Sequence, residues 1–476
     1  MRKQLLISFL GICLSSIAYS QDIQRFSERQ IIGTARYVGM GGAMTAIGGD
    51  PSAVLDNPAG LGLYRRSEIA LTVDETIDQT AQSYATQCQT RSRFALPHVS
   101  AVWAWGKTNK QRGLIFNNLM FSINRLANFN RDVAVKGQHM GMAETISLLT
   151  QGLPEGSFDE NAWNNDDIGW LSILGYDGYL INPILDTLAT DPMKRYQWTP
   201  AAELDNGTLA ISESGNSDQY TLTWAGNISN QWYIGLSLNV PTLSYTKRVT
   251  HYETNRLHSA ELQSLYHLSG VGVSGSIGLI YRPIQAIRMG LSFLTPTVMG
   301  TSVQTTGDLH TSIDGKQYDV LTPESGLLSA ELVSPLRTSV SIAGQIGNEG
   351  LIAVQYDYAH SAEMEDVHTL RIGTEAQVYR GLFLNAGYVY ESSFIKEYPV
   401  WMLGYNDIRT DMDYRYTPQS QYASVGLGYR SDVVVAQLAY QYRWQTIHQY
   451  ASECQLHPIE VGTRTHRIVA TLAWRF

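Results

Sequence analysis

Residues 467–476 read RIVATLAWRF and form the last stretch of the sequence. The even positions from Ile468 to Trp474 are all apolar, and the stretch stops on the aromatic Phe476. A period of two is that of a β-strand, in which successive side chains point to opposite faces. Strands that cross an outer membrane have this pattern, with one face in lipid and the other in a polar interior. The stretch therefore predicts a transmembrane β-barrel, whose terminal aromatic suits the barrel-insertion machinery.

The same alternation recurs through the chain. In Trp232–Val240 the even positions are Trp, Ile, Leu, Leu and Val, while the odd positions are Tyr, Gly, Ser and Asn; Val271–Arg282 and Val434–Trp444 behave alike. We count about fourteen such segments, an even number as single-chain barrels require. The expected strands lie near 67–75, 97–106, 112–124, 218–229, 231–246, 267–282, 285–296, 334–346, 350–360, 366–380, 382–392, 418–430, 432–446 and 463–476.

The connections between these segments alternate in length, as periplasmic turns and extracellular loops do. Short turns alternate with mostly long connections, at roughly 76–96, 125–217, 247–266, 297–333, 361–365, 393–417 and 447–462. A soluble β-sandwich is the alternative, but it has no reason to keep this alternation. The fold class we predict is all-β, a transmembrane antiparallel β-barrel at residues 65–476, in which 125–217 is the largest loop.

Composition agrees with this fold class. Only 16% of the residues are charged, against about 25% in ordinary soluble domains, yet the mean hydropathy is a mildly polar -0.16. A helical membrane protein would be far more apolar, whereas in a barrel the lipid-facing and lumen-facing residues cancel. The net charge of -9 argues against a nucleic-acid partner, which would favour a basic surface.

The N-terminus has the features of a secretory signal peptide. Arg2 and Lys3 precede an apolar run from Leu5 to Ile17, and Ala18-Tyr19-Ser20 supplies a small-x-small cleavage site. The run is shorter than the ~20 residues of a spanning helix. We therefore expect residues 1–20 to be a signal peptide, and the mature chain to reach the outer membrane of a Gram-negative bacterium.

Residues 21–64 differ from the strand-like remainder. Gly39, Gly41 and Gly42 permit close backbone approach or positive φ, and Asn57-Pro58 marks a turn. A glycine-rich linker is the alternative, but a linker would not carry apolar residues so regularly. We interpret residues 21–64 as a compact N-terminal plug (hatch) inside the barrel.

Residues 35–61, ARYVGMGGAMTAIGGDPSAVLDNPAGL, resemble the FadL/TodX family of outer-membrane transporters of long-chain fatty acids and aromatic hydrocarbons. Asn57, Pro58 and Ala59 match the hatch motif of that family. The resemblance implies a fourteen-stranded barrel whose hatch blocks the lumen. It also implies that apolar ligands bind near extracellular loops and leave sideways, into the lipid, through a kinked third strand.

The third expected strand contains a change of phase. Leu114 and Phe116 are apolar in one phase and Phe121 in the other, with Asn117 and Asn118 at the slip. Such a change predicts a bulge or kink, so we place a lateral opening at Asn117 and Asn118. The alternative is a polar residue tolerated near a neighbouring loop.

The connection 125–217 is unusually apolar for a surface loop. We select Trp163, Trp170, Leu171 and Leu174 within it as ligand-binding residues. The alternative is a folded cap that packs only against the rim of the barrel.

Other chemistry is sparse. No Ser/His/Asp arrangement suggests an enzyme, and we expect no catalytic residues, no cofactor and no metal site, since the spacing of His448, His457 and His466 fits no ligand motif. Cys88 and Cys454 allow one disulfide. It would join the first and last outer loops, which closure of the barrel makes neighbours; two free thiols are the alternative.

The predicted function is therefore that of an outer-membrane channel for passive uptake of hydrophobic small molecules, by loop capture, plug movement and lateral exit. The partners we expect are a hydrophobic ligand, outer-membrane lipid and the insertion machinery. Three alternatives stay open: a barrel component of a secretion system that binds exported cargo, a hemin-binding receptor, and an open porin.

Overall fold

A computed structural model describes most of the mature chain. The described residues are 26–27, 29–82, 88–106, 112–185, 188–189, 195–323, 328–347, 349–361, 365–393, 408–455 and 457–476. The predicted signal peptide, residues 1–20, lies outside them, as do 21–25 and 28 of the predicted plug.

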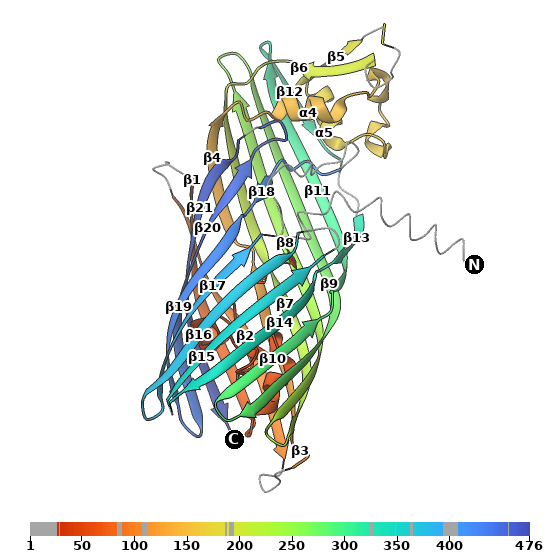
Figure 1. Ribbon diagram of the computed structural model, residues 1–476. Helices are drawn as coiled ribbons and strands as arrows, with labels where there is room; N and C mark the ends of the chain where they lie inside the picture. Colours follow the sequence, from red (N-terminus) through yellow and green to blue (C-terminus); the bar gives the residue numbers. More distant parts are fainter. Residues whose placement is uncertain are drawn as a thin grey trace, which may run out of the picture.

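Fourteen strands form a closed antiparallel barrel (Figure 1). The ring closes through the first and last strands, whose ladder runs from Glu68 opposite Arg475 to Gln82 opposite Val461. The predicted fold class is thus confirmed, and each of the fourteen predicted segments lies on one of these strands. They are β1 (Glu68–Gln82), β2 (Gln89–Gly106), β3 (Leu114–Asn128), β7 (Asn206–Ile228), β8 (Trp232–Thr254), β9 (Ser259–Ile284), β10 (Ile287–Leu294), β14 (Leu336–Ile346), β15 (Gly350–His360), β16 (Val367–Tyr379), β17 (Leu382–Ser392), β19 (Gln419–Arg430), β20 (Val434–Tyr450) and β21 (Ile459–Arg475).

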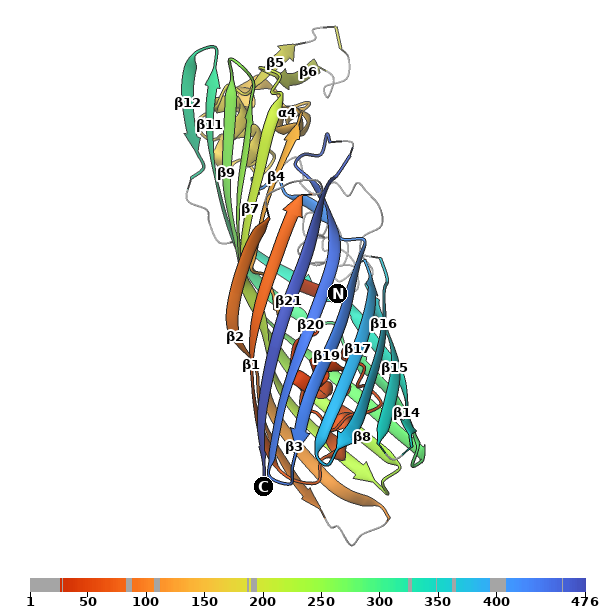
Figure 2. The same cartoon turned by 90° about the vertical axis from the view of Figure 1, so that its left-hand side faces the viewer.

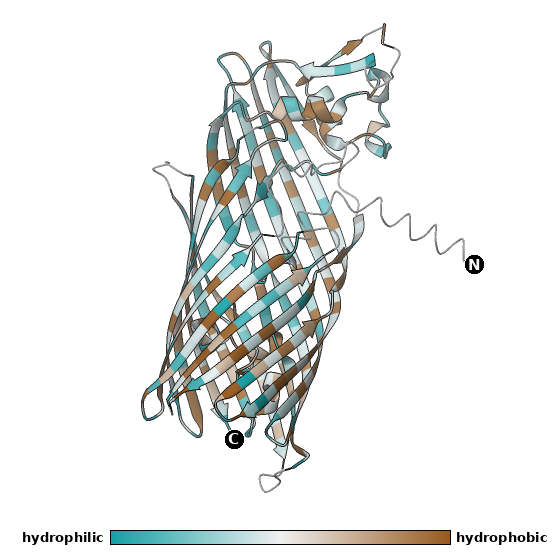
Figure 3. Ribbon diagram, viewed as in Figure 1, coloured by the Kyte–Doolittle hydropathy of each residue, from teal (hydrophilic) through white to brown (hydrophobic). Residues whose placement is uncertain are grey.

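The lower part of the wall is apolar outside and polar inside. On β8, Leu236 and Leu238 face outward and are 52% and 53% exposed, while Ser237 and Asn239 between them are buried. Hydrophobic residues recur along the outside of the lower strands (Figure 3). This is the pattern of side chains that contact lipid on one face and a wet lumen on the other.

Five strands continue well beyond the predicted limits. β1 ends at Gln82 rather than 75 and β2 begins at Gln89 rather than 97, so most of the predicted loop 76–96 is strand. β7 begins at Asn206 rather than 218, β8 ends at Thr254 rather than 246, and β9 begins at Ser259 rather than 267. The predicted loop 247–266 is therefore wrong, because it is a hairpin of β8 and β9.

The reason for this error is an inversion of polarity along the strands. Above Val240 the outward positions of β8 are polar, such as Ser244 and Arg248, and the inward ones, Leu243 and Tyr245, are buried. A strand that has left the lipid meets water outside and needs a packed interior. The alternation continues, but with its faces exchanged.

Five further strands extend the wall. β4 (Arg131–Gln138) continues β3 along β7. β11 (Val298–Ile313), β12 (Lys316–Leu321) and β13 (Leu328–Val333) occupy most of the predicted loop 297–333, and β18 (Tyr414–Tyr416) pairs with β20. That predicted loop is also wrong as a loop.

A small cap lies at the end of the barrel opposite the C-terminus (Figure 1). Its elements are α4 (Met142–Thr150), η3 (Glu155–Ser157), η4 (Ala162–Asn164), α5 (Trp170–Asp177) and the hairpin of β5 (Ile181–Leu185) with β6 (Tyr196–Pro200). No helix in the described part of the chain is long and apolar enough to span a membrane.

The segment predicted as the plug lies inside the lower half of the ring (Figure 2). It contains α3 (Ala35–Gly39), η1 (Ala53–Leu55) and η2 (Pro58–Leu63). Met40 and Met44 are fully buried, in a core shared with wall residues such as Ala343 and Val389. From here on, "plug" means the described residues 26–27 and 29–64.

The polarity inversion predicts opposite outcomes for two arginine substitutions on the same face of β8. Leu238→Arg places a charge in lipid and should reduce the free energy of unfolding by about 2–4 kcal/mol. Ser244→Arg, above the inversion, should change it by less than about 0.5 kcal/mol. Urea titration of protein folded into lipid vesicles measures both, and equal losses would contradict the inversion.

Candidate functional site

The Asn57-Pro58-Ala59 turn connects the plug to the barrel wall. Asn57 caps η2, its side-chain Oδ1 accepting from the amide N of Ala59 (3.0 Å). Its Nδ2 donates to the carbonyl of Thr45 (2.8 Å) and, more weakly, to that of Leu279 in β9 (3.3 Å). The asparagine amide therefore satisfies partners in the turn, in the rest of the plug and in the wall.

The wall has glycines where this turn touches it. A Cβ atom at Gly278 of β9 would lie 1.9 Å from Asn57 Oδ1, and one at Gly235 of β8 would lie 2.3 Å from the carbonyl carbon of Pro58. Both positions face inward, so these two strands admit the turn only because the side chains are missing.

Similar geometry explains why the three predicted plug positions are glycines. Gly41 and Gly42 have φ of +60° and +70°, in the left-handed region that favours glycine. A Cβ atom at Gly39 would lie 2.1 Å from the side-chain oxygen of Asn385 in β17. All three residues therefore sit at a tight turn or a close approach between plug and wall.

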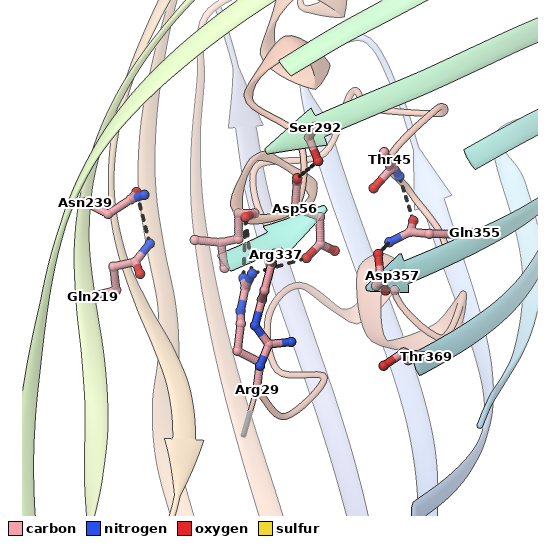
Figure 4. A network of polar contacts seen from close by, with 12 residues as sticks. Arg29, Thr45, Asp56, Gln219, Asn239, Ser292, Arg337, Gln355, Asp357 and Thr369 are labelled. Carbon is pink, nitrogen blue, oxygen red and sulfur yellow. Dashed lines mark hydrogen bonds and ion pairs between the residues drawn. The ribbon is translucent and has the colours of Figure 1, made fainter. Parts of the chain in front are cut away.

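A buried ionic network fixes the plug to one side of the lumen. The carboxylate of Asp56 accepts from the Tyr37 hydroxyl (2.6 Å) and from Arg371 Nη1 of β16 (3.1 Å). Arg371 also pairs with Asp357 of β15 (2.8 Å). Figure 4 shows Asp56 beside Arg29, which is 3.6 Å from it, and Gln355 between Thr45 and Asp357.

A second ionic anchor lies nearer the C-terminal end of the barrel. Arg36 of the plug forms two bonds with Glu375 of β16 (2.7 and 3.0 Å), and Arg430 of β19 binds the same carboxylate. Removing one partner of such a buried pair typically costs about 3–5 kcal/mol. The body of the plug, from α3 to η2, is thus firmly attached.

Asn117 and Asn118 do not form an opening in this structure. Both residues pair with β2 on one side and with β7 on the other. Asn118 is buried and its Nδ2 donates to the carbonyls of Leu61 (2.6 Å) and Tyr64 (3.1 Å) of the plug. The register shifts of β3 against β7 lie elsewhere, at Leu114/Phe116 and at Arg125/Ala127. The expected gap is therefore misplaced, and Asn118 instead holds the plug.

The ladder between β2 and β3 does stop higher up. Its last pair is His98 with Asn124, and within the described residues β2 from Gln89 to Pro97 pairs only with β1. β3 ends at Asn128, and β4 resumes the pairing with β7 at Arg131. We call the edge between Gln89–Pro97 and Arg125–Arg131 the seam.

The N-terminal part of the plug lies against the seam. The backbone amide of Gln30 donates to the carbonyl of Leu126 (3.2 Å). Its side chain donates to the carbonyl of Asn128 (3.1 Å) and accepts from the amide of the same residue (3.3 Å). Phe26 packs edge-on against Phe129, with ring centroids 5.6 Å apart. Gln30 thus supplies partners that a neighbouring strand would otherwise give to β3. Nothing in the sequence pattern marks it.

Two cavities adjoin this part of the plug. The polar cavity is lined by Gln30, by 128–131 and by side chains of β1, β20 and β21. The apolar cavity is lined mainly by Phe26, Leu126 and side chains of β10, β11 and β13, together with Arg29 and Arg337.

The residues predicted to bind ligand form the core of the cap. Trp163 and Trp170 pack edge-to-face at 5.8 Å, and Leu171 and Leu174 are buried against α4 and the rim. The structure brings the four together around the cap interior, which their own side chains fill. In the cap, burial raises the pKa of Glu144.

A buried ion pair lies on the extended wall near the cap. Burial would raise the pKa of Asp411, in the connection before β18, but the neighbouring Arg409 (3.0 Å) and Lys247 hold it well below its usual range.

The predicted disulfide is wrong, because Cys88 and Cys454 are both free and exposed. Gln89, next to Cys88, lies opposite Thr80, which in turn lies opposite Thr463. Cys454 lies nine residues before Thr463, beyond the start of β21, and each strand residue adds roughly 3.3 Å. The two loops are neighbours around the ring but differ in height. No group of His, Cys, Asp or Glu side chains in the described ranges could hold a metal ion.

Solved structures with the same architecture include the CymD monoaromatic hydrocarbon channel, with a TM-score of 0.53 at 12% identity over 94% of this chain and 99% of that one. A Pseudomonas aeruginosa FadL homologue gives 0.53 at 10% identity, and the Ralstonia pickettii toluene transporter TbuX gives 0.52 at 12%, both with the same coverage. The chain has the FadL/TodX fold. The fold that the resemblance implied is thus confirmed. No protein-family model and no curated protein matches the sequence.

The FadL/TodX fold places the plug in the lumen, and its contact with Gly278 can be tested. Gly278→Ala should displace the Asn57 turn, at a cost of roughly 1–3 kcal/mol for overpacking, and should raise single-channel conductance in planar bilayers. Gly275→Ala is the control on the same strand, since its nearest neighbour beyond adjacent residues is 3.6 Å away. Equal conductance of the two variants would show that the turn does not close the lumen.

Proposed function

We propose that the chain is an outer-membrane channel for passive uptake of hydrophobic small molecules, which leave the lumen sideways through the seam. The observation that carries this proposal is the attachment of Gln30 to the unpaired end of β3. Beneath this segment the wall has no backbone ladder, and side chains bridge it: Arg91 of β2 bonds to Asp132 (3.1 Å) and Arg93 to Asn128 (3.0 Å). This edge is the route that we propose for an apolar molecule from the lumen to lipid.

The strengths of the plug contacts favour movement of its N-terminal part alone. Gln30 is held by three hydrogen bonds, each worth roughly 0.5–1.5 kcal/mol net. The body of the plug is held by buried ion pairs at Asp56 and Glu375, whose loss costs several times more. In our proposal Phe26, Ser27, Arg29 and Gln30 detach from the seam while α3 and η2 remain in place, and this movement also separates Arg29 from Asp56 (3.6 Å).

The residues around the seam are suited to a hydrophobic ligand. Phe94 and Leu96 of β2 face outward beside it and are 69% and 51% exposed. A cargo that passes from water to lipid gains about 0.8 kcal/mol per methylene, so transport needs no energy input. CymD and TbuX, which share the fold, are named for monoaromatic hydrocarbons and toluene, and this supports a hydrophobic cargo.

Capture is assigned to the cap. Its packed core presents Trp163, Trp170, Leu171 and Leu174 above the rim, and a ligand would reach them only if α5 shifts. We keep these four residues as the proposed first contact.

A cross-link at the seam tests the route. In a Cys88→Ser/Cys454→Ser background, Gln30→Cys with Asn128→Cys should form a disulfide that holds the plug on β3. Oxidised cells should then lose most of their uptake of an apolar naphthylamine dye, followed by fluorescence, and a reductant should restore it.

The matched control is Ser100→Cys with Ser122→Cys, two directly opposed residues of β2 and β3 below the seam. This cross-link joins strands that are already paired, so uptake should be unchanged. Normal uptake with the Gln30–Asn128 cross-link formed would exclude the seam as the exit.

A further inference from the structure

A groove crosses the upper parts of β19, β20 and β21, which Figure 2 shows side by side. Along β20 and β21 the residues between the lining positions, such as Ile447 and Val461, are buried. The lining side chains of these two strands therefore point away from the lumen, to the outside of the wall. Those that matter here are Gln421, Trp444, Thr446, Glu460, Gly462 and Arg464.

An interruption of the sheet forms one side of this outer groove. β18 pairs with β20 as far as Tyr416 opposite His448, and β19 resumes the pairing at Ser420 opposite Gln445. Pro418, between the two strands, lines the groove. The wall is therefore recessed here on its outer face.

Gly462 leaves a space in the groove that the protein itself does not explain. A Cβ atom at this position would have one neighbour within 4 Å, the carbonyl oxygen of Ala81 at 3.8 Å, and the φ of Gly462 is not in the left-handed region. Gly235 and Gly278, by contrast, are needed where the plug approaches the wall. Since glycine weakens a strand, the missing side chain leaves room for a molecule outside the chain.

The groups around this space match the chemistry of a sugar. Trp444 is half-buried and stacks on Tyr442, with ring centroids 5.5 Å apart. An aromatic ring of this kind packs against the C–H groups on the face of a sugar ring, while the hydroxyls on the rim of the sugar need both donors and acceptors. The groove supplies amide, hydroxyl, carboxylate and guanidinium groups, from Gln421, Thr446, Glu460 and Arg464.

The charges of the lining favour hydroxyl groups over a phosphate. Apart from His448, its ionisable side chains are one carboxylate and one guanidinium, Glu460 and Arg464, on either side of Gly462. A phosphate is bound best by an excess of arginine or lysine. A balanced pair of charges, with neutral amide and hydroxyl groups beside it, fits an uncharged sugar better.

The position of the groove indicates where such a sugar comes from. Below it on the same outer face, Leu438 of β20 and Ile468 of β21 are 52% and 48% exposed and belong to the apolar surface that contacts lipid. Ile468 is four residues from Arg464, roughly 13 Å along the strand. We propose that the groove binds the sugar head of a glycolipid of the outer leaflet, with a sugar ring on Trp444 above Gly462 and the acyl chains against the wall below. The site lies outside the barrel and does not depend on the uptake route.

Native mass spectrometry of the purified full chain tests the assignment, in a polyoxyethylene detergent, which carries no sugar. The probes are lipid A, which is an acylated glucosamine disaccharide, lipid A without its phosphates, and phosphatidylglycerol. Both forms of lipid A should be retained about tenfold better than phosphatidylglycerol, because several hydrogen bonds to hydroxyls are added. Retention that is lost with the phosphates, or equal retention of phosphatidylglycerol, would overturn the sugar site.

Filling the groove localises the site. Gly462→Ile suits a strand, since β-branched residues favour this conformation, and should lower the retention of lipid A about tenfold. Gly300→Ile is the matched control, because Gly300 is exposed on β11 and a Cβ atom there would have no neighbour within 4 Å. Heat-modifiable migration in electrophoresis checks that both variants are folded.

A second pair of variants separates the groove from the aromatic surface of the wall in general. Trp444→Leu should lower the retention of lipid A several-fold, whereas Trp474→Leu, at the opposite end of the outer face and 56% exposed, should leave it unchanged. Equal losses in these two variants would overturn the groove as a specific site. Retention that neither Gly462→Ile nor Trp444→Leu lowers would overturn it as well.

Discussion

Inside a bilayer every backbone N–H and C=O has to find its partner within the protein, because lipid offers none. The closed ring meets this demand through β1 and β21, and the paired strands between them. Pairing between neighbouring strands stops along the seam, where β2 leaves β3 above His98 and Asn124. The seam lies at the polarity inversion, since Asn128 is opposite Asn216, which is opposite Ser244. There the partner for Leu126 and Asn128 comes from Gln30, which belongs to the plug and not to the wall. Backbone partners that neighbouring strands supply elsewhere in the wall are supplied at the seam by a residue of the plug.

The plug has two parts that differ in how strongly they are attached to the wall. From Ala35 to Leu63 its backbone approaches wall glycines and its charges are paired with wall charges, so that any shift must break buried ion pairs or create overlaps. Before Thr34 the contacts with the wall are a few hydrogen bonds and the packing of Phe26 and Ile31, and the one ion pair in the described part of this segment, Arg29 with Asp56 at 3.6 Å, is made within the plug. A ligand that competes for the contacts of Phe26 or Gln30 therefore has to overcome only a small part of the total attachment.

The sequence predicts the ring well because lipid imposes a strict alternation on every strand, from Trp232–Val240 to the last residues. It fails above the membrane, where the outward positions of β8 are polar and the inward ones mix apolar residues such as Leu243 and Tyr245 with buried charges such as Lys247, so that the continued strand resembles a loop. The change of phase at Asn117 and Asn118 does not mark a lateral opening, because Asn118 faces inward and binds the plug. The alternation of side chains along the strand does not reveal this contact. Inward glycines such as Gly235 and Gly278 were a usable signal, since glycine weakens a strand unless another backbone approaches it. The role of Gln30 at the seam could not be predicted from the sequence. Gln30 lies in an irregular segment, where no periodic pattern exists from which a single polar residue could depart.

The N-terminal part of the plug separates the two cavities. The first described residues of the plug line both: Gln30 lines the polar cavity, and Phe26, Ser27 and Arg29 line the apolar one. The same short segment therefore lies at the seam and between two spaces: one lined by four arginines, and a more apolar one in which leucines and Met299 are joined by Arg29 and Arg337. In the route proposed above, release of this segment would join the two spaces and uncover the seam in one movement. A molecule with a charged end and an apolar body would then find partners for both ends at once, whereas a fully apolar molecule would use only one side of the passage. The chemistry on the two sides of the plug's first residues, more than the shape of the barrel, decides which cargo can drive that movement.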